Sequence, residues 1–92
     1  MLIFEWDDDK AESNFAKHGI SFPDARDVFN DPLAIEGEDR SLTYGEIRWR
    51  IIGTGKGRVL TVIYTEREDT IRLISARKST RAERHEYHNA KR

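Results

Sequence analysis

The chain has 92 residues, of which 37% are hydrophobic and 36% charged, and it contains no cysteine. This length predicts one domain over residues 1–92, and the lack of thiols excludes a disulfide scaffold or a thiolate-bound metal. No apolar run approaches the ~20 residues of a membrane span, and the N-terminus lacks a signal-peptide pattern, so a cytoplasmic protein is expected.

The net charge of −1 conceals a strong asymmetry between the two halves of the chain. Residues 1–46 carry four Lys or Arg against twelve Asp or Glu, whereas residues 47–92 carry twelve against five. A basic half of this kind indicates an anionic partner, and nucleic acid is the commonest large one. Neutralisation of one half by the other across the fold is the alternative.

The N-terminal part predicts a short strand and a helix. Leu2–Trp6 alternates as a strand. The run Asp7–Asp9 then opens a helix over residues 9–17, because carboxylates satisfy the free N–H groups of a first helical turn. A metal site is less favoured, since consecutive carboxylates rarely converge on one ion. The stripe of this helix is expected to include Ala11, Phe15 and His18.

A second helix follows the first after a glycine stop at Gly19. It begins at the Ser21 cap, and its buried face is spaced i, i+3, i+6, i+7. That face consists of Phe22, Ala25, Val28 and Phe29. The residues Asn-Asp-Pro at 30–32 end this helix, and 33–35 are extended. Residues 36–43 have the composition of an exposed loop.

The middle of the chain predicts two strands of a sheet. Tyr44–Thr54 alternates, with Arg48 and Arg50 on the same face. Residues 53–57 form a glycine-rich hairpin loop, which lacks the spacing of a phosphate-binding loop. Val59–Thr65 is apolar on both faces and is therefore expected to be a central strand.

The last predicted strand, Thr70–Lys78, carries three cations in nine residues. Simple alternation assigns Arg72 and Arg77 to opposite faces. Cations on a strand must reach solvent, a carboxylate or a phosphate, so this strand is expected to supply part of a phosphate-binding surface. A suitable turn register would gather Arg48, Arg50 and Arg72 on one open face.

A basic helix from Arg81 to about Ala90 follows, with Thr80 as its cap and Glu83 completing a capping box. It has little apolar surface and should pack lightly. The order of elements predicts an α+β fold. This fold is an antiparallel sheet of about four to five strands, with two N-terminal helices on one face and a C-terminal helix.

Short sequence pieces spread along nearly the whole chain match one known pattern. They are Phe4-Glu5-Trp6-Asp7 with Lys10 and Asn14, Lys17-His18-Gly19-Ile20-Ser21-Phe22, Ala25, Val28-Phe29-x-Asp31-Pro32-Leu33, Tyr64-Thr65-Glu66-Arg67, and Ile71-Arg72-Leu73-Ile74-Ser75-Ala76-Arg77-Lys78 followed by Glu83, Arg84 and Tyr87. Together they resemble the BrnT family, the toxin half of a bacterial type II toxin–antitoxin pair. Glu68 departs from the pattern, since many relatives have glycine there, and this leaves the type of the last hairpin turn open.

The resemblance implies a RelE-like fold and a ribonuclease activity that inhibits translation. It also implies a BrnA-type antitoxin, whose ribbon-helix-helix domain would bind operator DNA, so that the toxin meets DNA only through its partner. No cofactor and no metal ion are expected.

Metal-independent RNA cleavage needs a base for the 2′-OH, cations for the charge that builds on the phosphate, and an acid for the leaving 5′-oxygen. Arg72 and Arg77 are the first candidates for the cationic role, because arginine stays charged and its fork meets two phosphate oxygens. Ion pairs with the acidic half of the chain are the alternative. The residues expected to bind RNA are Arg48, Arg50, Lys78 and Arg81.

The predicted catalytic set is Lys17, His18, Glu66, Arg72 and Arg77. Further acid–base candidates are Tyr64, His85 and His88. Histidine titrates near neutral pH, but His18 could also be a ring packed under its helix, and Glu66 could be a surface charge beside a turn. Trp6 and Trp49 could stack on bases, although core packing is favoured.

Two other functions fit the same residues: a non-catalytic nucleic-acid-binding module, and a protein-interaction domain whose acidic and basic halves meet different partners. Loss of RNA cleavage in folded variants of His18, Arg72 or Arg77 would favour the ribonuclease. Salt-sensitive binding without cleavage would favour the binding module, and absence of nucleic-acid binding would favour the interaction domain.

Overall fold

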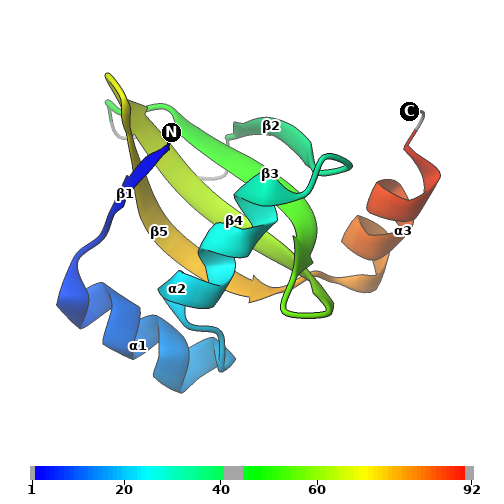
Figure 1. Cartoon of the computed structure of the whole chain (residues 1–92), viewed down its shortest axis with the longest axis horizontal. Coiled ribbons are helices and arrows are strands. Elements are labelled where there is room, and N and C mark those ends of the chain that lie inside the picture. Colours follow the sequence, from blue (N-terminus) through cyan, green and yellow to red (C-terminus); the bar gives the residue numbers. More distant parts are fainter. Residues whose placement is uncertain (1, 41–44, 91–92) are drawn as a thin grey trace.

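The computed structural model describes residues 2–40 and 45–90. Its centre is a five-stranded sheet with the strand order β1-β5-β4-β3-β2, and Figure 1 shows α1 and α2 in front of this sheet and α3 at its far end. The strands are β1 (Ile3–Glu5), β2 (Ile35–Asp39), β3 (Arg48–Gly55), β4 (Arg58–Arg67) and β5 (Thr70–Lys78). All neighbours are antiparallel except β1 and β5, which are parallel. The predicted α+β fold is thus confirmed.

Helix α1 (Asp8–His18) begins at Asp7, whose side chain accepts hydrogen bonds from the backbone N–H groups of Asp9 and Lys10 at 2.9 and 3.1 Å. The acidic run therefore caps a helix, as predicted. Among the residues that the structure describes, no three His, Asp or Glu side chains are placed to share a metal ion. The helix ends at Gly19, which has a left-handed φ of 73°.

Helix α2 (Phe22–Ala25) begins at the Ser21 cap and continues as the 3-10 helix η1 (Arg26–Asn30). The core lies between these helices and the sheet. It includes Ile20, Phe22, Ala25, Val28, Ile51, Leu60, Val62, Tyr64, Ile71, Leu73 and Ala76. Trp6 and Trp49 pack against this core, as expected.

Helix α3 (Arg81–Asn89) carries the predicted capping box between Thr80 and Glu83. Only Glu83 and Tyr87 of this helix are buried, which confirms that it packs lightly. The hydroxyl of Tyr87 hydrogen-bonds that of Thr54 on β3 at 3.1 Å. No described helix is long and apolar enough to cross a membrane.

Two predicted loops are shorter than their composition suggested. Residues 35–39 form the strand β2 at the edge of the described sheet. Its exposed residues are charged, so its composition resembles that of a loop. Gly53 and Gly55 belong to β3, and the hairpin turn is only Lys56–Gly57, both with positive φ. Two such residues fit the tight turn that matches the twist of the strands. The strand predicted at 44 and the loop predicted at 41–43 lie outside the described residues.

The turn between β4 and β5 consists of Glu68 and Asp69, since Arg67 is opposite Thr70. Glu68 has a φ of 53°, in the region that glycine adopts most easily. Glu68 therefore adopts a glycine-like backbone in a turn of two residues.

A β-bulge interrupts β5 between its two arginines. Ile63 of β4 is opposite Ser75, but the next residue, Tyr64, is opposite Leu73. Ile74 therefore has no partner on β4. One extra residue in a strand reverses the alternation of every side chain beyond it.

This bulge corrects the predicted faces of β5. Ala76 is fully buried on the same inner face as Leu73, although simple alternation separates them. Arg77 therefore shares the outer face with Arg72, instead of lying on the opposite one. We call this outer face of the sheet, opposite α1 and α2, the open face.

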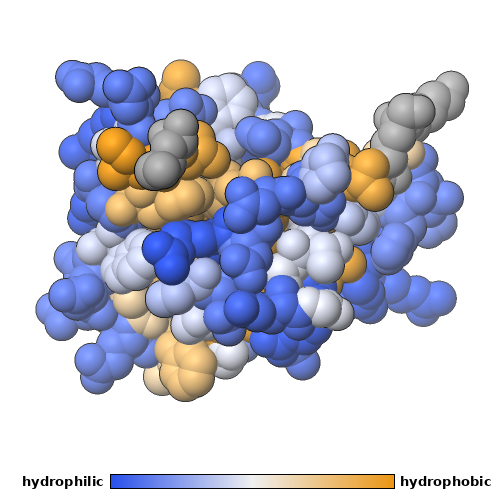
Figure 2. Space-filling model, in the orientation of Figure 1, coloured by the Kyte–Doolittle hydropathy of each residue, from blue (hydrophilic) through white to orange (hydrophobic). Residues whose placement is uncertain are grey.

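The side that carries α1 and α2 is largely hydrophilic at its surface, with apolar side chains gathered around the start of β1 (Figure 2). Leu2 and Ile3 are 50% and 55% exposed there. The cationic groups discussed below lie on the opposite side or along the edge of β5.

Candidate active site

Four arginines of β3 and β5 lie on the open face, because residues paired across neighbouring strands point to the same side. We name three rows across this face. The turn row joins two sets of paired residues, Glu5 with Arg72 and Thr65, and Arg48 with Asp39. The two sets adjoin because Arg48 and Thr65 flank the pair formed by Trp49 and Tyr64. The middle row holds Ser75, Ile63, Arg50 and Gly37, and the helix row holds Arg77, Thr61, Ile52 and Ile35. The predicted grouping of Arg48, Arg50 and Arg72 is confirmed, and Arg77 joins it.

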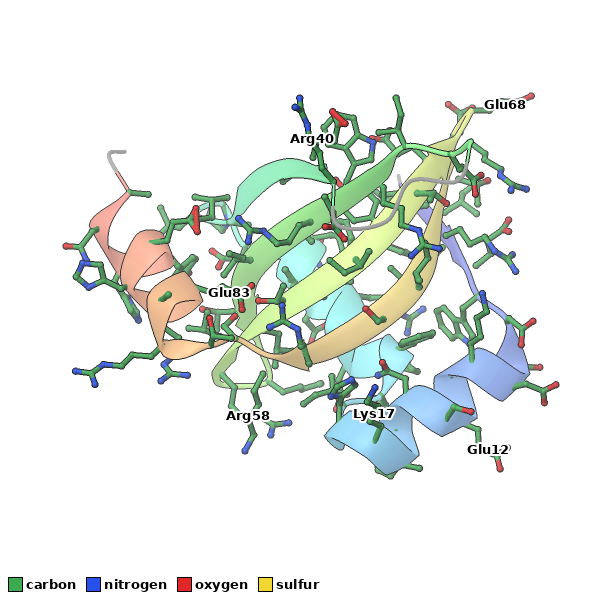
Figure 3. All side chains as sticks on the ribbon, turned by 180° about the vertical axis from the view of Figure 1, so that it is seen from behind. Glu12, Lys17, Arg40, Arg58, Glu68 and Glu83 are labelled. Atoms are coloured by element: carbon green, nitrogen blue, oxygen red, sulfur yellow. The ribbon has the colours of Figure 1, made fainter. Side chains whose placement is uncertain are left out.

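Arg77 forms a two-pronged ion pair with Glu83 of α3. Its Nη1 lies 2.6 Å from Oε1, and its Nη2 lies 3.0 Å from Oε2. Arg50 reaches the same carboxylate at 3.6 Å and also contacts Glu86 at 3.5 Å. Glu83 stands at the junction of α3 and the sheet (Figure 3). One carboxylate thus holds two guanidinium groups side by side.

Glu83 is 7% exposed and has two further donors. The hydroxyl of Thr61 and the N–H of Thr80 donate to it at 3.0 and 2.8 Å. The hydrogen bond from Arg77 lowers the pKa of Glu83 to about 2, against the opposing effect of burial, and the same bond raises the pKa of Arg77. A carboxylate with so low a pKa is a poor base at neutral pH. Its role is to fix the two arginines.

The remaining predicted cations are paired differently. Arg72 forms an ion pair with Glu5 of β1. Within residues 2–40 and 45–90, Arg48, Lys78 and Arg81 make no ion pair. Lys78 and Arg81 are exposed where β5 meets α3, so their charges face solvent.

Helix α1 meets β5 where β1 no longer covers its edge. The amide of Asn14 donates to the carbonyl oxygens of Ala76 and Ile20 at 2.9 and 3.0 Å, and the N–H of Ala76 donates back at 3.1 Å. Asn14 is 7% exposed, whereas Phe15, predicted on the helix stripe, is 57% exposed. The prediction for Phe15 is wrong. Helix α1 instead directs the Asn14 side chain towards backbone groups of Ile20 and Ala76, which need hydrogen-bond partners.

A shallow groove of about 220 Å³ lies beside this amide contact. It is lined by Lys10, Ser13, Asn14, Lys17, His18, Ile74 and Ser75. Ser75 belongs to the middle row, so the groove meets the open face at this residue. Lys17 projects from α1 near β5 (Figure 3). The structure therefore places Lys17 and His18 beside the strand that carries Arg72 and Arg77.

A comparison with protein-family models gives one match, over residues 6–83, to the ribonuclease toxin BrnT of type II toxin–antitoxin systems. The chain belongs to the BrnT family. The matched segment contains the groove, the four arginines of the open face and Glu83. A type II toxin of this kind has an RNA substrate and a cognate antitoxin. A search of curated proteins finds no match.

In this BrnT family member, Glu66 lies apart from Arg77. It is opposite Ile71, which puts it on the inner face, five residues along β4 from Thr61. That separation corresponds to roughly 16 Å along the strand. Glu66 therefore does not join Arg77 in one constellation.

The other acid–base candidates are also placed away from the groove. Tyr64 is 2% exposed and donates to Glu36 at 2.6 Å, and burial together with this bond raises its pKa well above the ordinary value. Such a group holds its proton and does not reach solvent. His85 and His88 are exposed on α3. Of these candidates, His18 is the one that lines the groove.

Proposed function

We propose that this BrnT family member cleaves RNA on its open face without a metal ion. The RNA 2′-OH loses its proton and bonds to the adjacent phosphorus, while the bond from phosphorus to the 5′-oxygen breaks and that oxygen gains a proton. The products are a 2′,3′-cyclic phosphate end and a 5′-hydroxyl end. Translation stops because messenger RNA is lost.

The observation that carries this proposal is the shared anchoring of Arg50 and Arg77 by Glu83. Arg50 and Arg77 both meet the buried Glu83 carboxylate, and Arg50 also meets Glu86, so two carboxylates balance the two guanidinium groups. What this pair offers a phosphate is a set of N–H donors that are already fixed in place. Groups that are already held in place stabilise developing charge without reorganising during the reaction. The free N–H groups of the two arginines are the donors that would meet the phosphate oxygens.

His18 supplies the proton transfers in this proposal, and Lys17 supports it. Both line the groove that ends at Ser75, two residues before Arg77 on β5. His18 exchanges a proton with the reacting oxygens, and Lys17 adds positive charge beside them. Glu66 has no part in this arrangement because of its place on the inner face.

We further propose a BrnA-type antitoxin that covers the open face and carries all contact with operator DNA. A cationic surface attracts an acidic or strand-forming segment of a partner. Strand β2 (Ile35–Asp39) lies at the edge of the described sheet, next to the strand that carries Arg48, and such a segment would add to the sheet there. A complex that inhibits cleavage and leaves Arg50 and Arg77 uncovered would contradict this mode of inhibition.

The test is cleavage of end-labelled RNA by the purified protein in excess EDTA. We expect cyclic-phosphate products, a loss of about 100-fold or more in Arg77→Ala, and a similar loss in His18→Ala. Lys56→Ala is the matched control, because it also removes one positive charge. Lys56 pairs only loosely with Asp27, at 3.5 Å, and both side chains are exposed. Urea unfolding checks that each variant is folded.

Two results would overturn the proposal. One is cleavage that EDTA abolishes, and the other is full activity in folded Arg77→Ala and His18→Ala. If free RNA is not cut, the same variants are compared on messenger RNA in a translating extract. Absence of cleavage there by the unmodified protein would also reject the proposed activity.

A further inference from the structure

We infer that the turn row is a second phosphate-binding site, in which Arg48, Thr65 and Arg72 hold an RNA backbone phosphate other than the one that is cleaved. This inference rests on the proposed function, because that function makes RNA the ligand. The site lies on the same open face, at the end of the sheet away from α3.

The first observation is the state of the Thr65 side chain. Thr65 is 1% exposed, and its hydroxyl is the buried side-chain group that finds no hydrogen-bond partner in the described part of the chain. Thr61, two rows away on the same strand, bonds Ser79 and Glu83. A buried hydroxyl without a partner opposes folding, and valine would fill the same space. Because this hydroxyl is buried, a phosphate meets it only when the side chains that cover it turn aside.

The second observation is the order of charges along the turn row. Following the strands from β1 to β2, the row reads Glu5, Arg72, Thr65, Arg48 and Asp39. The two carboxylates stand at the outer ends. Arg72 is opposite Thr65, and Arg48 comes directly before Trp49, which is opposite Tyr64. Arg48 makes no ion pair within the described residues, and Arg72 gives one nitrogen to Glu5. The centre of the row thus presents guanidinium donors, which suit phosphate oxygens.

The spacing of the rows separates this site from the proposed reaction centre. Thr65 and Thr61 are four residues apart on β4, which corresponds to roughly 13 Å along the strand. A single phosphate cannot contact both Thr65 and the Arg77–Glu83 pair over that distance. The turn row would therefore bind a neighbouring nucleotide and align the strand along β4 and β5.

Binding of a 2′-O-methyl RNA oligonucleotide tests this inference, because blocking the 2′-oxygen prevents cleavage. The dissociation constant is measured over a salt series. Removing one phosphate contact from a single-stranded ligand lowers the slope of log K against log salt by about 0.7. We expect this change in Arg48→Ala, with a five- to twenty-fold weaker affinity. Lys56→Ala has the same charge change and should keep the slope.

The hydroxyl is tested separately with Thr65→Val and Thr65→Ser. The valine variant should bind the oligonucleotide about three- to ten-fold more weakly while its urea midpoint rises, and the serine variant should bind like the unmodified protein. Glu5→Gln should tighten binding, because it releases Arg72. The inference is overturned if Thr65→Val is more stable and binds the oligonucleotide normally. It is also overturned if the salt dependence of binding for Arg48→Ala has the same slope as for Lys56→Ala.

The two proposals fail in distinguishable ways. If Arg77→Ala loses cleavage but Arg48→Ala and Thr65→Val bind RNA normally, only the second site is rejected. If the unmodified protein neither binds the oligonucleotide nor cleaves RNA, the proposed function is rejected, and the second site with it. If Arg48→Ala weakens binding of the antitoxin but not of RNA, the turn row is a contact for protein, and the inference is overturned.

Discussion

Asn14 of α1 and Ala76 of β5, which are 62 positions apart in the sequence, exchange hydrogen bonds of 2.9 and 3.1 Å. The side-chain amide takes the place that a neighbouring strand would occupy at the edge of β5. Ala76 comes two residues after the bulge at Ile74 and directly before Arg77. It therefore ties the groove on α1 to the strand that carries the arginines.

Asn14→Ala should lower the free energy of unfolding by about 2–3 kcal/mol, because the backbone N–H of Ala76 and two carbonyl oxygens lose their partner. Urea denaturation measures this loss. Ser13→Ala, at the adjacent exposed position on the same helix, is the control and should change stability little. A cost below about 0.5 kcal/mol for Asn14→Ala would show that water replaces the amide.

Acid should destabilise the fold through Glu83. Its pKa is lowered from an ordinary 4.5 to about 2, so its contribution is complete above pH 4.5 and is lost as the pH falls through the range from 4.5 to 2. The loss should reach about 2–3 kcal/mol. Glu83→Gln should be less stable at pH 7 and should show a flatter profile across this range. Urea unfolding of both proteins between pH 7 and 2.5 tests this, and parallel profiles would contradict it.

Gly53→Ala should be destabilising by about 1–3 kcal/mol through overpacking. An added Cβ would lie 3.0 Å from both the Ala34 Cβ and a methyl group of Val28. Gly37→Ala on the neighbouring strand is the matched control, because a Cβ there meets nothing within 4 Å. Thermal unfolding should separate the two variants, and equal midpoints would mean that η1 moves aside to accept the extra methyl group.

Glu68→Gly should stabilise the protein by about 1 kcal/mol, because it removes the penalty of a left-handed backbone at a residue with a Cβ. Asp69→Gly serves as the comparison, since Asp69 does not have a positive φ and glycine there only adds freedom to the unfolded chain. A higher midpoint for Asp69→Gly than for Glu68→Gly would contradict this account of the turn.

Most of the fold could be predicted from local patterns. The caps at Asp7, Ser21 and Thr80 identified where the helices begin. Alternation identified β3 and β5, and a run that is apolar on both faces identified β4. The face of Arg77 could not be predicted, because a bulge at Ile74 leaves no mark in a segment that alternates plausibly without it. The resulting error placed Arg77 on the wrong side of its strand.

The candidate site was predicted in part. The structure places His18 and Lys17 beside β5, but their roles stay predictions. Glu83 was assigned only to the capping box, and this local explanation hid its ion pairs with Arg50 and Arg77. Asn14 could have been noticed as a polar residue close to the buried stripe of α1. Thr65 could have been noticed in the same way, since it places a hydroxyl group on the apolar central strand.

The parallel pairing of β1 with β5 has a consequence for synthesis on the ribosome (Figure 1). The first strand to emerge, Ile3–Glu5, must wait for residues 70–72 before it finds its neighbour. Contacts between such distant segments form late in folding. Arg72 and Arg77 arrive on the same late strand. A nascent chain therefore has no assembled arginine face until that strand has been released.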